Sequence, residues 1–444
     1  MKMKTDVAIV GGGPGGCVMA MYLLEQGITP LVIEKETFPR YHIGESMTGE
    51  AGNLLRSLGL EEILVRNAHP RKQGVNVIAR NGNGWWVPVM KRNDDHQLEP
   101  AQTWQVRRSD FDRDMMAEAI RRGARWLPGR AAQVRRSADG TVTGLQVQGE
   151  DGSTVEVESE VLVDASGQYT WLAHQGVTSR KNPGRYDKQI AIFSQVRDTI
   201  RGEGWDGTDR ARHPDNTYIF YAGQYHWAWF IPLDNDAVSV GVVSPSSYFA
   251  SKGESREAFL RRELAELNPE MARRLKDLTL IEEARAIPNY SYHITEFTGK
   301  GWMCIGDTHR FIDPIFSFGL YVSMKEAQFA APVIKRYLAG EGRDLPNPFL
   351  AHMQRMEGAI DHLQDLIDGF WGASTSFAYL VNNPRTRDQM IDLFAGRIYD
   401  VTPETHPAIL ELRALAEKAR QSGALWGEDR RGSGFASPAV PATT

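Results

Sequence analysis

The chain has 444 residues, of which 41% are hydrophobic and 24% are charged, and its net charge at pH 7 is −5. This length accommodates two or three domains, and the balanced charge argues against nucleic acid or an anionic membrane surface as the partner. No apolar run reaches the roughly eighteen residues of a membrane span, so we expect a soluble cytoplasmic protein without a membrane span. Cys17 and Cys304 lie far apart in apolar runs, which predicts buried thiols in a reducing compartment and neither a disulfide nor a metal site.

The N-terminal stretch DVAIVGGGPGGCVMAMYLL (residues 6–24) predicts a strand, a glycine turn and a helix. In a dinucleotide-binding βαβ unit, Gly11 makes the tight turn, Gly13 lets the backbone approach a pyrophosphate, and Gly16 allows close helix packing. The next strand ends in Glu34, eighteen residues after Gly16, where a carboxylate can bind the ribose hydroxyls. We therefore predict a bound dinucleotide; the alternative is an ordinary glycine-rich loop.

Two short segments after this unit allow both a structural and a functional interpretation. Gly44-Glu45-Ser46 precedes a helical pattern and fits a capped turn as well as a site loop. Lys72 follows Pro70 in a loop, where a lysine is usually a solvated charge. The Asn-Gly pairs within residues 81–84 then mark a hairpin between two strands.

Three predicted strands end in small or acidic residues at turns. The ends lie at Gly11, at Asp164 in the segment DASG, and at Gly306-Asp307. In an open α/β sheet ligands gather at such strand ends. Arg108, just before a helical pattern, is either a phosphate or adenine partner or a residue of an ordinary helix face.

The rest of the chain predicts a second sheet followed by helices. Residues 186–290 hold apolar runs separated by polar loops, and one helix is expected over 254–278 because its charges match the macrodipole. The final segment is rich in proline and small residues, which predicts disorder. The expected parts are a discontinuous nucleotide-binding domain (1–75, 101–185 and 291–345), a substrate-side β-sheet domain (76–100 and 186–290), a helical C-terminal region (346–424) and a disordered tail (425–444).

Glu34, Arg108, the DASG segment and Gly306-Asp307, together with the first glycine turn, resemble the FAD-binding pattern of the flavoprotein monooxygenase superfamily over about residues 1–345. The resemblance implies an α/β fold with a Rossmann-like FAD-binding domain of the GR2/PHBH-like type and an inserted antiparallel sheet. It implies that Glu34 binds the adenosine ribose and that Asp307 meets the ribityl chain. The cofactor-binding residues implied are Gly11, Gly13, Pro14, Gly16, Glu34, Lys35, Arg40, Ser46, Arg108, Asp164, Asp307, Asp313 and Gly319.

Two features narrow the resemblance to the flavin-dependent halogenases. Residues 227–232 read WAWFIP and match WxWxIP, although two tryptophans on one strand face also fit an ordinary core. Lys72 is placed like the lysine of that family, shortly before a strand. By this resemblance, reduced FAD, O₂ and chloride or bromide give hypohalous acid, and Lys72 relays it to an electron-rich aromatic substrate, free or tethered to a carrier protein. The implied shield between substrate and flavin consists of Trp227, Trp229, Ile231 and Pro232.

The segment DPIFSFGL resembles the halide loop of the family, with Ser317, Phe318 and Gly319 at the halide. Relatives commonly carry Ser or Thr where Phe318 stands. Halogenases of free tryptophan carry a glutamate where this chain has Phe316, so the resemblance favours the phenol and pyrrole branch. The aspartate that is joined covalently to FAD in at least one relative corresponds to Asp313.

Three functions remain open at this stage. The first is a halogenase, whose reduced FAD would come from a separate flavin reductase because no second glycine fingerprint is visible. The second is a non-halogenating FAD-dependent monooxygenase or an oxidoreductase similar to geranylgeranyl reductases, which Phe318 favours. The third is a flavin-binding protein without catalysis, which Lys72 and WxWxIP argue against.

Overall fold

The first strand lies inside a mostly parallel sheet, with its apolar residues buried between helices. A computed structural model describes residues 1–423 except 204, 224, 235 and 400, so the predicted disordered tail lies outside the described residues. In sheet order the strands are β10 (Arg130–Arg136), β11 (Val142–Gln148), β12 (Thr154–Asp164), β1 (Lys2–Val10), β2 (Leu31–Glu34) and β9 (Arg125–Pro128). Two more strands extend it, β22 (Trp302–Cys304) beside β12 and β21 (Thr298–Gly299) beside β22.

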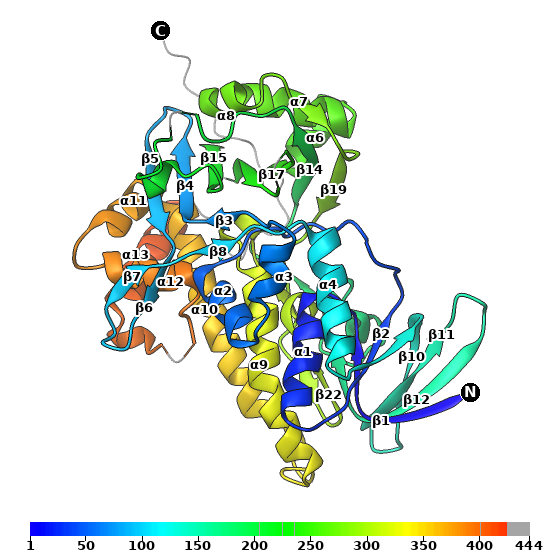
Figure 1. Ribbon diagram of the computed structural model, residues 1–444. Coiled ribbons are helices and arrows are strands. Elements are labelled where there is room, and N and C mark those ends of the chain that lie inside the picture. The colour runs from blue at the N-terminus through cyan, green and yellow to red at the C-terminus, as the bar shows by residue number, and fades with distance from the viewer. Residues whose placement is uncertain (204, 224, 235, 400, 424–444) are drawn as a thin grey trace.

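Helices cover this first sheet because its central strands are apolar on both faces. The helix α1 (Pro14–Glu25) begins with a proline, whose fixed φ suits the first helical position, and packs against α9 and α4 (Figure 1). The helices of this part are α2 (Gly49–Ser57), α3 (Glu61–Arg66), α4 (Arg108–Arg121), α5 (Trp171–His174) and α9 (Gly319–Leu338). Among them lie the 3₁₀ turns η1 (Gly167–Tyr169), η3 (Gly306–Thr308) and η4 (Pro314–Phe316).

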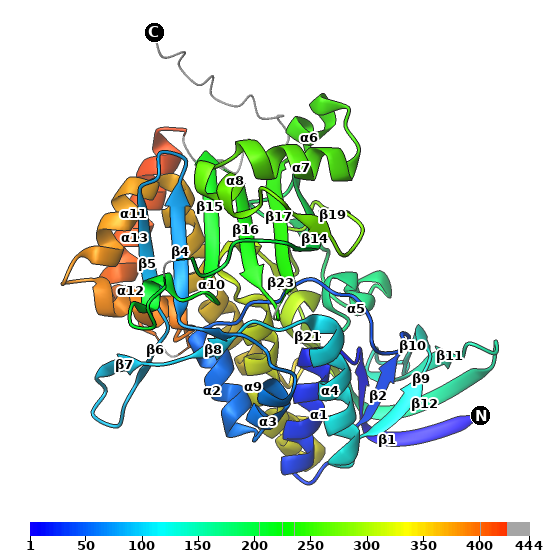
Figure 2. The same ribbon diagram turned by 45° about the horizontal axis from the view of Figure 1, so that its top comes forward.

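A second sheet joins segments that are far apart in the sequence. In sheet order it runs β18 (Thr279–Leu280), β14 (Gln189–Arg197), β17 (Val238–Pro245), β16 (His226–Pro232), β15 (Thr217–Gly223), β4 (Gly74–Ala79) and β5 (Gly84–Pro88), with β19 (Arg285–Pro288) also on β14. Figure 2 shows β4 beside β15, and the two strands pair in parallel with Thr217 opposite Val75. The predicted hairpin at residues 81–84 is confirmed, because β4 and β5 pair antiparallel across it.

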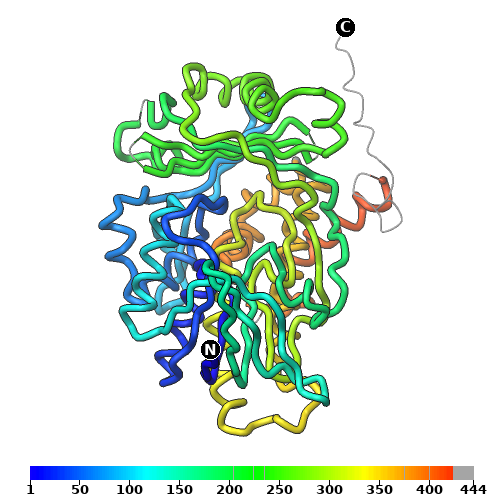
Figure 3. Tube along the Cα trace, turned by 90° about the vertical axis from the view of Figure 1, so that its right-hand side faces the viewer, coloured from blue at the N-terminus to red at the C-terminus, as the bar shows by residue number. Residues whose placement is uncertain are grey.

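The second sheet forms a separate layer above the rest of the chain (Figure 3). Its outer face packs against α7 (Arg256–Glu266) and α8 (Pro269–Arg274), while α6 (Ser246–Lys252) follows β17. The prediction of one helix over 254–278 is wrong. The helix ends before Asn268, whose side chain accepts from the amides of Glu270 and Met271, and Pro269 starts a new helix there.

The C-terminal helices pack beside β5 and against α9. They are α10 (Leu350–Gly372), α11 (Ser374–Asn382), α12 (Arg387–Ala395) and α13 (Pro407–Gln421), with η5 (Pro403–Thr405) before the last. Three small sheets complete the fold: β3 (Arg71–Lys72) with β8 (Thr103–Trp104), β6 (Met90–Arg92) with β7 (Leu98–Pro100), and β13 (Asn182–Pro183) with β20 (Tyr292–His293) and β23 (Arg310–Phe311). The 3₁₀ turn η2 (Arg210–Arg212) lies against β4. Among the described residues, no helix has the length and apolar character needed to cross a lipid bilayer.

Candidate active site

A cavity of about 790 Å³ lies between the end of the first sheet and the inner face of the second. This volume falls in the range of roughly 300–1,000 Å³ that is usual for ligand pockets. Gly11, Ala165 and Asp307 line it, so the three predicted strand ends meet at one cavity. The inner face of the second sheet closes the opposite side with Phe193, Trp229 and neighbouring apolar residues.

The glycine turn has the shape that a pyrophosphate requires. Gly11 has φ of +109°, and a Cβ there would lie 2.4 Å from the carbonyl oxygen of Ala165. A Cβ on Gly16 would lie 2.0 Å from the carbonyl oxygen of Gly11, so the helix can approach the turn only at a glycine. A Cβ on Gly13 would meet only Arg40 Nη2 at 3.8 Å, which leaves this backbone open to the cavity next to a guanidinium. The start of α1 therefore offers amide groups and an arginine to an anion.

Glu34 holds the turn as well as lining the cavity. Its carboxylate accepts from the amide of Gly12 at 2.7 Å and from the amide of Glu36 at 2.8 Å. Pro14, Lys35 and Arg40 line the same cavity, together with the half-exposed ring of Tyr169, which stands 5.7 Å from the Lys35 ammonium. The carboxylate oxygens keep further lone pairs for ribose hydroxyls.

Two of the predicted cofactor-binding residues do not line the large cavity. The carboxylate of Asp164 does not line the cavity; it accepts from the amides of Ser166 and Leu172. Gly16 also lies outside the lining and acts through packing. Both residues therefore shape the turns and do not face the cavity.

Arg108 lines the cavity with its donors already engaged. It makes a two-bond ion pair with Asp112 at 2.6 and 2.9 Å, and it donates to the carbonyls of Ile43 at 2.8 Å and Gly44 at 3.2 Å. It thus fixes the backbone just before Glu45. Asp307, which also lines the cavity, is partly buried, and loss of hydration raises its pKa to about 6.

The WxWxIP residues lie where the sequence predicts on β16. Trp227 and Trp229 share the inner face, with ring centroids 5.7 Å apart, and line the cavity together with Ile231. Trp229 Nε1 donates to Ser239 Oγ at 3.0 Å, which fixes the indole. Pro232, at the end of the strand, does not line the cavity.

The predicted halide loop forms a tight turn into α9. Asp313 Oδ1 accepts from the amide of Ile315 at 2.9 Å, and Ser317 takes the left-handed conformation with φ of +62°. Ser317, Phe318 and Gly319 all line the cavity at the N-terminal end of α9. Asp313 is buried, and loss of hydration raises its pKa to about 7.

Lys72 lies outside the large cavity, in a separate pocket of about 20 Å³. The sequence predicted a loop residue, either a solvated charge or the counterpart of the halogenase lysine. In the structure Lys72 is in β3 and is only 2% exposed. Its ammonium donates to Ser46 Oγ at 2.9 Å and to the carbonyl of Met47 at 3.0 Å. Burial lowers its pKa to about 7, with no carboxylate partner among the described residues.

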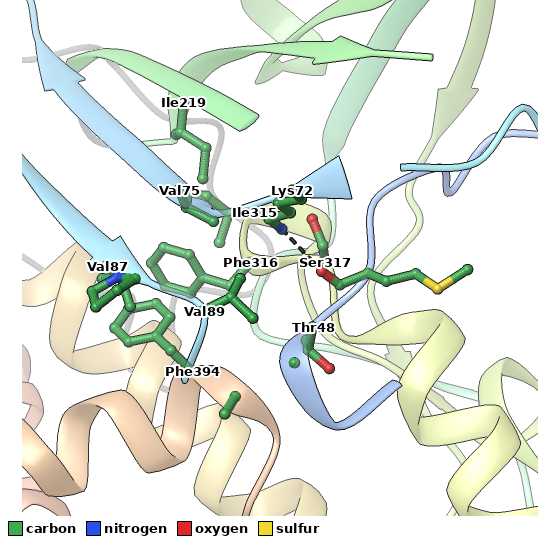
Figure 4. A pocket seen from close by; sticks show the side chains of 14 residues that line it. Thr48, Lys72, Val75, Val87, Val89, Ile219, Ile315, Phe316, Ser317 and Phe394 are labelled. Carbon is green, nitrogen blue, oxygen red and sulfur yellow. Dashed lines mark hydrogen bonds between the residues drawn. The ribbon is translucent and has the colours of Figure 1, made fainter. Parts of the chain in front are cut away.

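The two cavities share a wall, so Lys72 is close to the large cavity without entering it. Ile219, Ile315 and Ser317 line both, and Lys72 points toward the segment that carries Ser317 (Figure 4). Phe316 and Phe394 face the Lys72 side with centroids 4.9 Å apart. An apolar aromatic pocket is thus separated from the flavin-sized cavity by a few side chains.

Sequence reasoning missed several residues of the large cavity. Glu45, Tyr41 and Phe193 line it, and the Gly-Glu-Ser segment was the one local signal for them. His309, two residues after Asp307, is fully buried, and its Nε2 lies 3.0 Å from Glu326 Oε1. Arg310 is paired with Glu357 and Asp361, so these two residues have structural partners.

The sequence matches the FAD binding domain family over residues 4–345. A 1H-pyrrole-2-carbonyl-[peptidyl-carrier protein] brominase from Pseudoalteromonas luteoviolacea is 36% identical over 417 residues, 94% of this chain and 97% of the relative. The solved structure of the flavin-dependent brominase Bmp2 matches with a TM-score of 0.86 and 36% identity, covering 95% of this chain and 100% of that one. The chain belongs to the flavin-dependent halogenase family.

A second relative is also named for halogenation of a carrier-bound pyrrole. The 1H-pyrrole-2-carbonyl-[peptidyl-carrier protein] chlorinase from Pseudomonas fluorescens is 28% identical over 412 residues, 89% of each chain. This halogenase is thus an FAD-dependent oxidoreductase that uses chloride or bromide, as the sequence predicts. The cavity fits FAD, because the open Gly13 backbone beside Arg40 could accommodate a pyrophosphate and aromatic residues that a flavin ring could contact line the same cavity.

Proposed function

We propose that this halogenase brominates or chlorinates a pyrrole-2-carbonyl group tethered to a peptidyl-carrier protein. The activities of the brominase and chlorinase relatives support this substrate, and both matches extend over nearly the whole chain. The pocket at Lys72 supports a small apolar ring, since Val87, Val89, Phe316 and Phe394 form its walls. About 20 Å³ holds roughly one water, so side chains must move when the ring enters.

The observation that carries the proposal is the position of Lys72. Reduced FAD, when bound, supplies the oxidation of halide by O₂ to hypohalous acid, which is reactive toward many groups. Lys72 stands behind the shared wall of the two cavities, held by Ser46 and Met47. With a pKa of about 7, both its ammonium, which donates a hydrogen bond, and its free amine, which accepts the halogen, are populated at neutral pH.

The other proposed roles follow from position. Gly11, Gly13, Pro14 and Arg40 would hold the pyrophosphate, and Glu34 the ribose. Asp307 would meet the ribityl chain near the start of α9, while Ser317, Phe318 and Gly319 would surround the halide. Trp227, Trp229 and Ile231 would keep the ring away from the flavin, so that halogen and not flavin oxygen reaches the substrate.

The source of reducing equivalents belongs to the same proposal. No second dinucleotide fingerprint is visible in the sequence, which supports a separate flavin reductase as the partner. The buried free thiols of Cys17 and Cys304 fit a cytoplasmic enzyme.

The test uses a carrier protein loaded with the pyrrole-2-carbonyl group, a flavin reductase, NADH and FAD, with bromide or without halide. We expect a bromine isotope pattern on the carrier with wild-type enzyme. Lys72→Ala should give none while still binding FAD, and Lys91→Ala, a change in an exposed lysine paired with Glu99, should behave as wild type. Unchanged bromination by Lys72→Ala would refute the assignment of the lysine.

Phe318 favours one alternative, a monooxygenase that does not use halide. Its phenyl group lines the cavity at the position where the family resemblance leads us to expect Ser or Thr. In the same assay that enzyme would add one oxygen to the ring in both halves of the experiment. A halide-independent gain of one oxygen would therefore replace the halogenase by this alternative.

A further inference from the structure

Glu45 has an unused acidic group at the wall of the large cavity. The residue is only 1% exposed, yet it lines the cavity beside Tyr41, Phe193 and Trp229. Its Oε1 accepts from Gln195 Nε2 at 2.7 Å. Its Oε2 has no partner with hydrogen-bond geometry among the described residues. A buried carboxyl oxygen without a partner is costly, so its presence at a ligand cavity indicates a role in the bound state.

The backbone around Glu45 is held rigidly at both sides. Arg108 donates to the carbonyl of Gly44, and the amide of Val106 donates to the carbonyl of Glu45 at 2.7 Å. The next residue, Ser46, accepts from Lys72. Glu45 and Ser46 therefore both line the large cavity, and Ser46 also accepts a hydrogen bond from the lysine of the small pocket.

We propose that Glu45 is the proton donor of the large cavity for the formation of hypohalous acid. The overall step consumes one proton: reduced FAD, O₂, a halide ion and one proton give oxidised FAD, hypohalous acid and one water. Two electrons pass from the flavin and two from the halide to O₂, the O–O bond breaks, and new O–halogen and O–H bonds form. The carboxylic acid of Glu45 supplies the proton from Oε2 and is re-protonated from solvent. The inference rests on the proposed halogenase function.

The charges around Glu45 allow a neutral acid at working pH. Loss of hydration raises its pKa to about 7, against the opposing effect of Ser239, Gln195, Arg108 and Arg107. Arg107 is itself paired with Asp234 at 2.9 Å, which weakens its hold on the carboxylate. An acid with a pKa near the working pH combines a populated protonated form with an effective proton transfer.

Few other titratable or polar groups face Glu45 from the elements packed against it. On its own loop lies Tyr41, whose pKa burial and the charge of Glu45 raise, and Arg285 of β19 stands 4.4 Å over that ring. From the second sheet come the neutral Gln195 of β14 and Ser239 of β17, the latter also bonded to Trp229. None of these groups gives Glu45 a full ion pair.

The test separates oxidant formation from substrate halogenation. Purified enzyme receives pre-reduced FAD, O₂ and bromide, and a diffusible halogen-accepting dye reports hypobromous acid while peroxidase reports hydrogen peroxide. Glu45→Gln should lower the hypobromous acid yield by at least tenfold and raise hydrogen peroxide, with FAD affinity within about threefold of wild type. Lys72→Ala should still make hypobromous acid. If the proposed carrier-bound substrate is wrong, wild-type enzyme still gives the dye signal. If the proposal for Glu45 is wrong, Glu45→Gln gives the same dye signal as wild type, so the two failures can be told apart.

The pH profile and a spectrum distinguish proton donation from a structural role. Wild-type dye bromination should fall above pH about 7, about tenfold per pH unit, and Glu45→Gln should lack this fall, whereas Glu45→Asp should regain part of the rate. The apoprotein should show an infrared carboxylic-acid band at pH 6 that Glu45→Gln loses. Glu282→Gln is the matched carboxyl control outside the cavity.

Two results would overturn the proposal. One is a Glu45→Gln enzyme that keeps the wild-type yield and pH profile. The other is a Glu282→Gln enzyme that reproduces the loss, because the effect would then not depend on the carboxyl at the cavity wall.

Discussion

Replacing Lys72 by methionine should stabilise the apoprotein while it abolishes halogenation. The ammonium is buried without a carboxylate, and its pKa falls from 10.5 to about 7. At about 1.4 kcal/mol per pKa unit, keeping this charge buried costs at most about 5 kcal/mol below pH 7. Methionine fills similar space without the charge, and the cost of leaving Ser46 Oγ and the Met47 carbonyl without their donor lowers the net gain to a few kcal/mol.

The sign of the pH dependence follows from proton binding. Between pH 7 and 10.5 the unfolded chain holds a proton on Lys72 that the folded chain has lost, so this residue makes wild type more stable as pH rises. The advantage of Lys72→Met should therefore be largest below pH 7 and disappear by about pH 10.5. Chemical denaturation of both proteins at pH 6, 8 and 10 measures the difference. A constant difference across this range would refute the claim that the lysine is buried and unpaired.

The same variant is informative about catalysis. Removing a group that handles the transferred species typically costs about 10²–10⁴-fold in rate, so bromination should fall at least 10²-fold. Flavin binding should be unchanged because Lys72 lies outside the large cavity. Loss of bromination together with loss of flavin binding would instead indicate that the substitution changes the fold.

Three further outcomes are expected. Gly13→Val should give a colourless protein with FAD affinity lowered at least tenfold, since the new side chain would occupy the open backbone beside Arg40; absorbance of the purified protein shows this, and a yellow preparation would contradict the assignment. Trp229→Ala should lower stability by about 3–5 kcal/mol and let the carrier-bound ring approach the flavin, so that part of the carrier gains one oxygen; a carrier that gains bromine alone would contradict the shield. Asp313→Asn should stabilise the apoprotein relative to wild type, by a margin that grows between about pH 4 and 7 to at most about 4 kcal/mol. Over this range the unfolded carboxyl of wild type ionises while the folded one keeps its proton, so wild type loses stability as pH rises; equal unfolding curves at pH 8 would contradict the burial of Asp313.

The parts of the fold that depend on local pattern could be predicted from sequence. The glycine turn at residues 11–16 and the strand ends at Asp164 and Asp307 lie together because parallel strands of one sheet end at one edge. The tryptophans of β16 share a face because side chains alternate along a strand. The break at Asn268-Pro269 was missed, although a cap residue followed by proline is a helix start.

The environment of the site residues could not be predicted. Lys72 is buried only because β3 pairs with β8 and Ser46 lies beneath it, contacts that no local pattern records. Glu45 meets Gln195, 150 residues away in the sequence. Burial of this kind sets the pKa of both residues, and it becomes visible only when the second sheet is placed against the first.

The most direct test of the account is the intact mass of a pyrrole-loaded carrier protein after one addition of pre-reduced FAD, O₂ and bromide to the halogenase. We predict a carrier heavier by whole bromine-for-hydrogen exchanges, with the bromine isotope pattern, and no change without halide. A carrier that gains one oxygen with or without bromide, or one that stays unmodified while free hypobromous acid accumulates, would contradict the claim that Lys72 delivers halogen to a tethered ring.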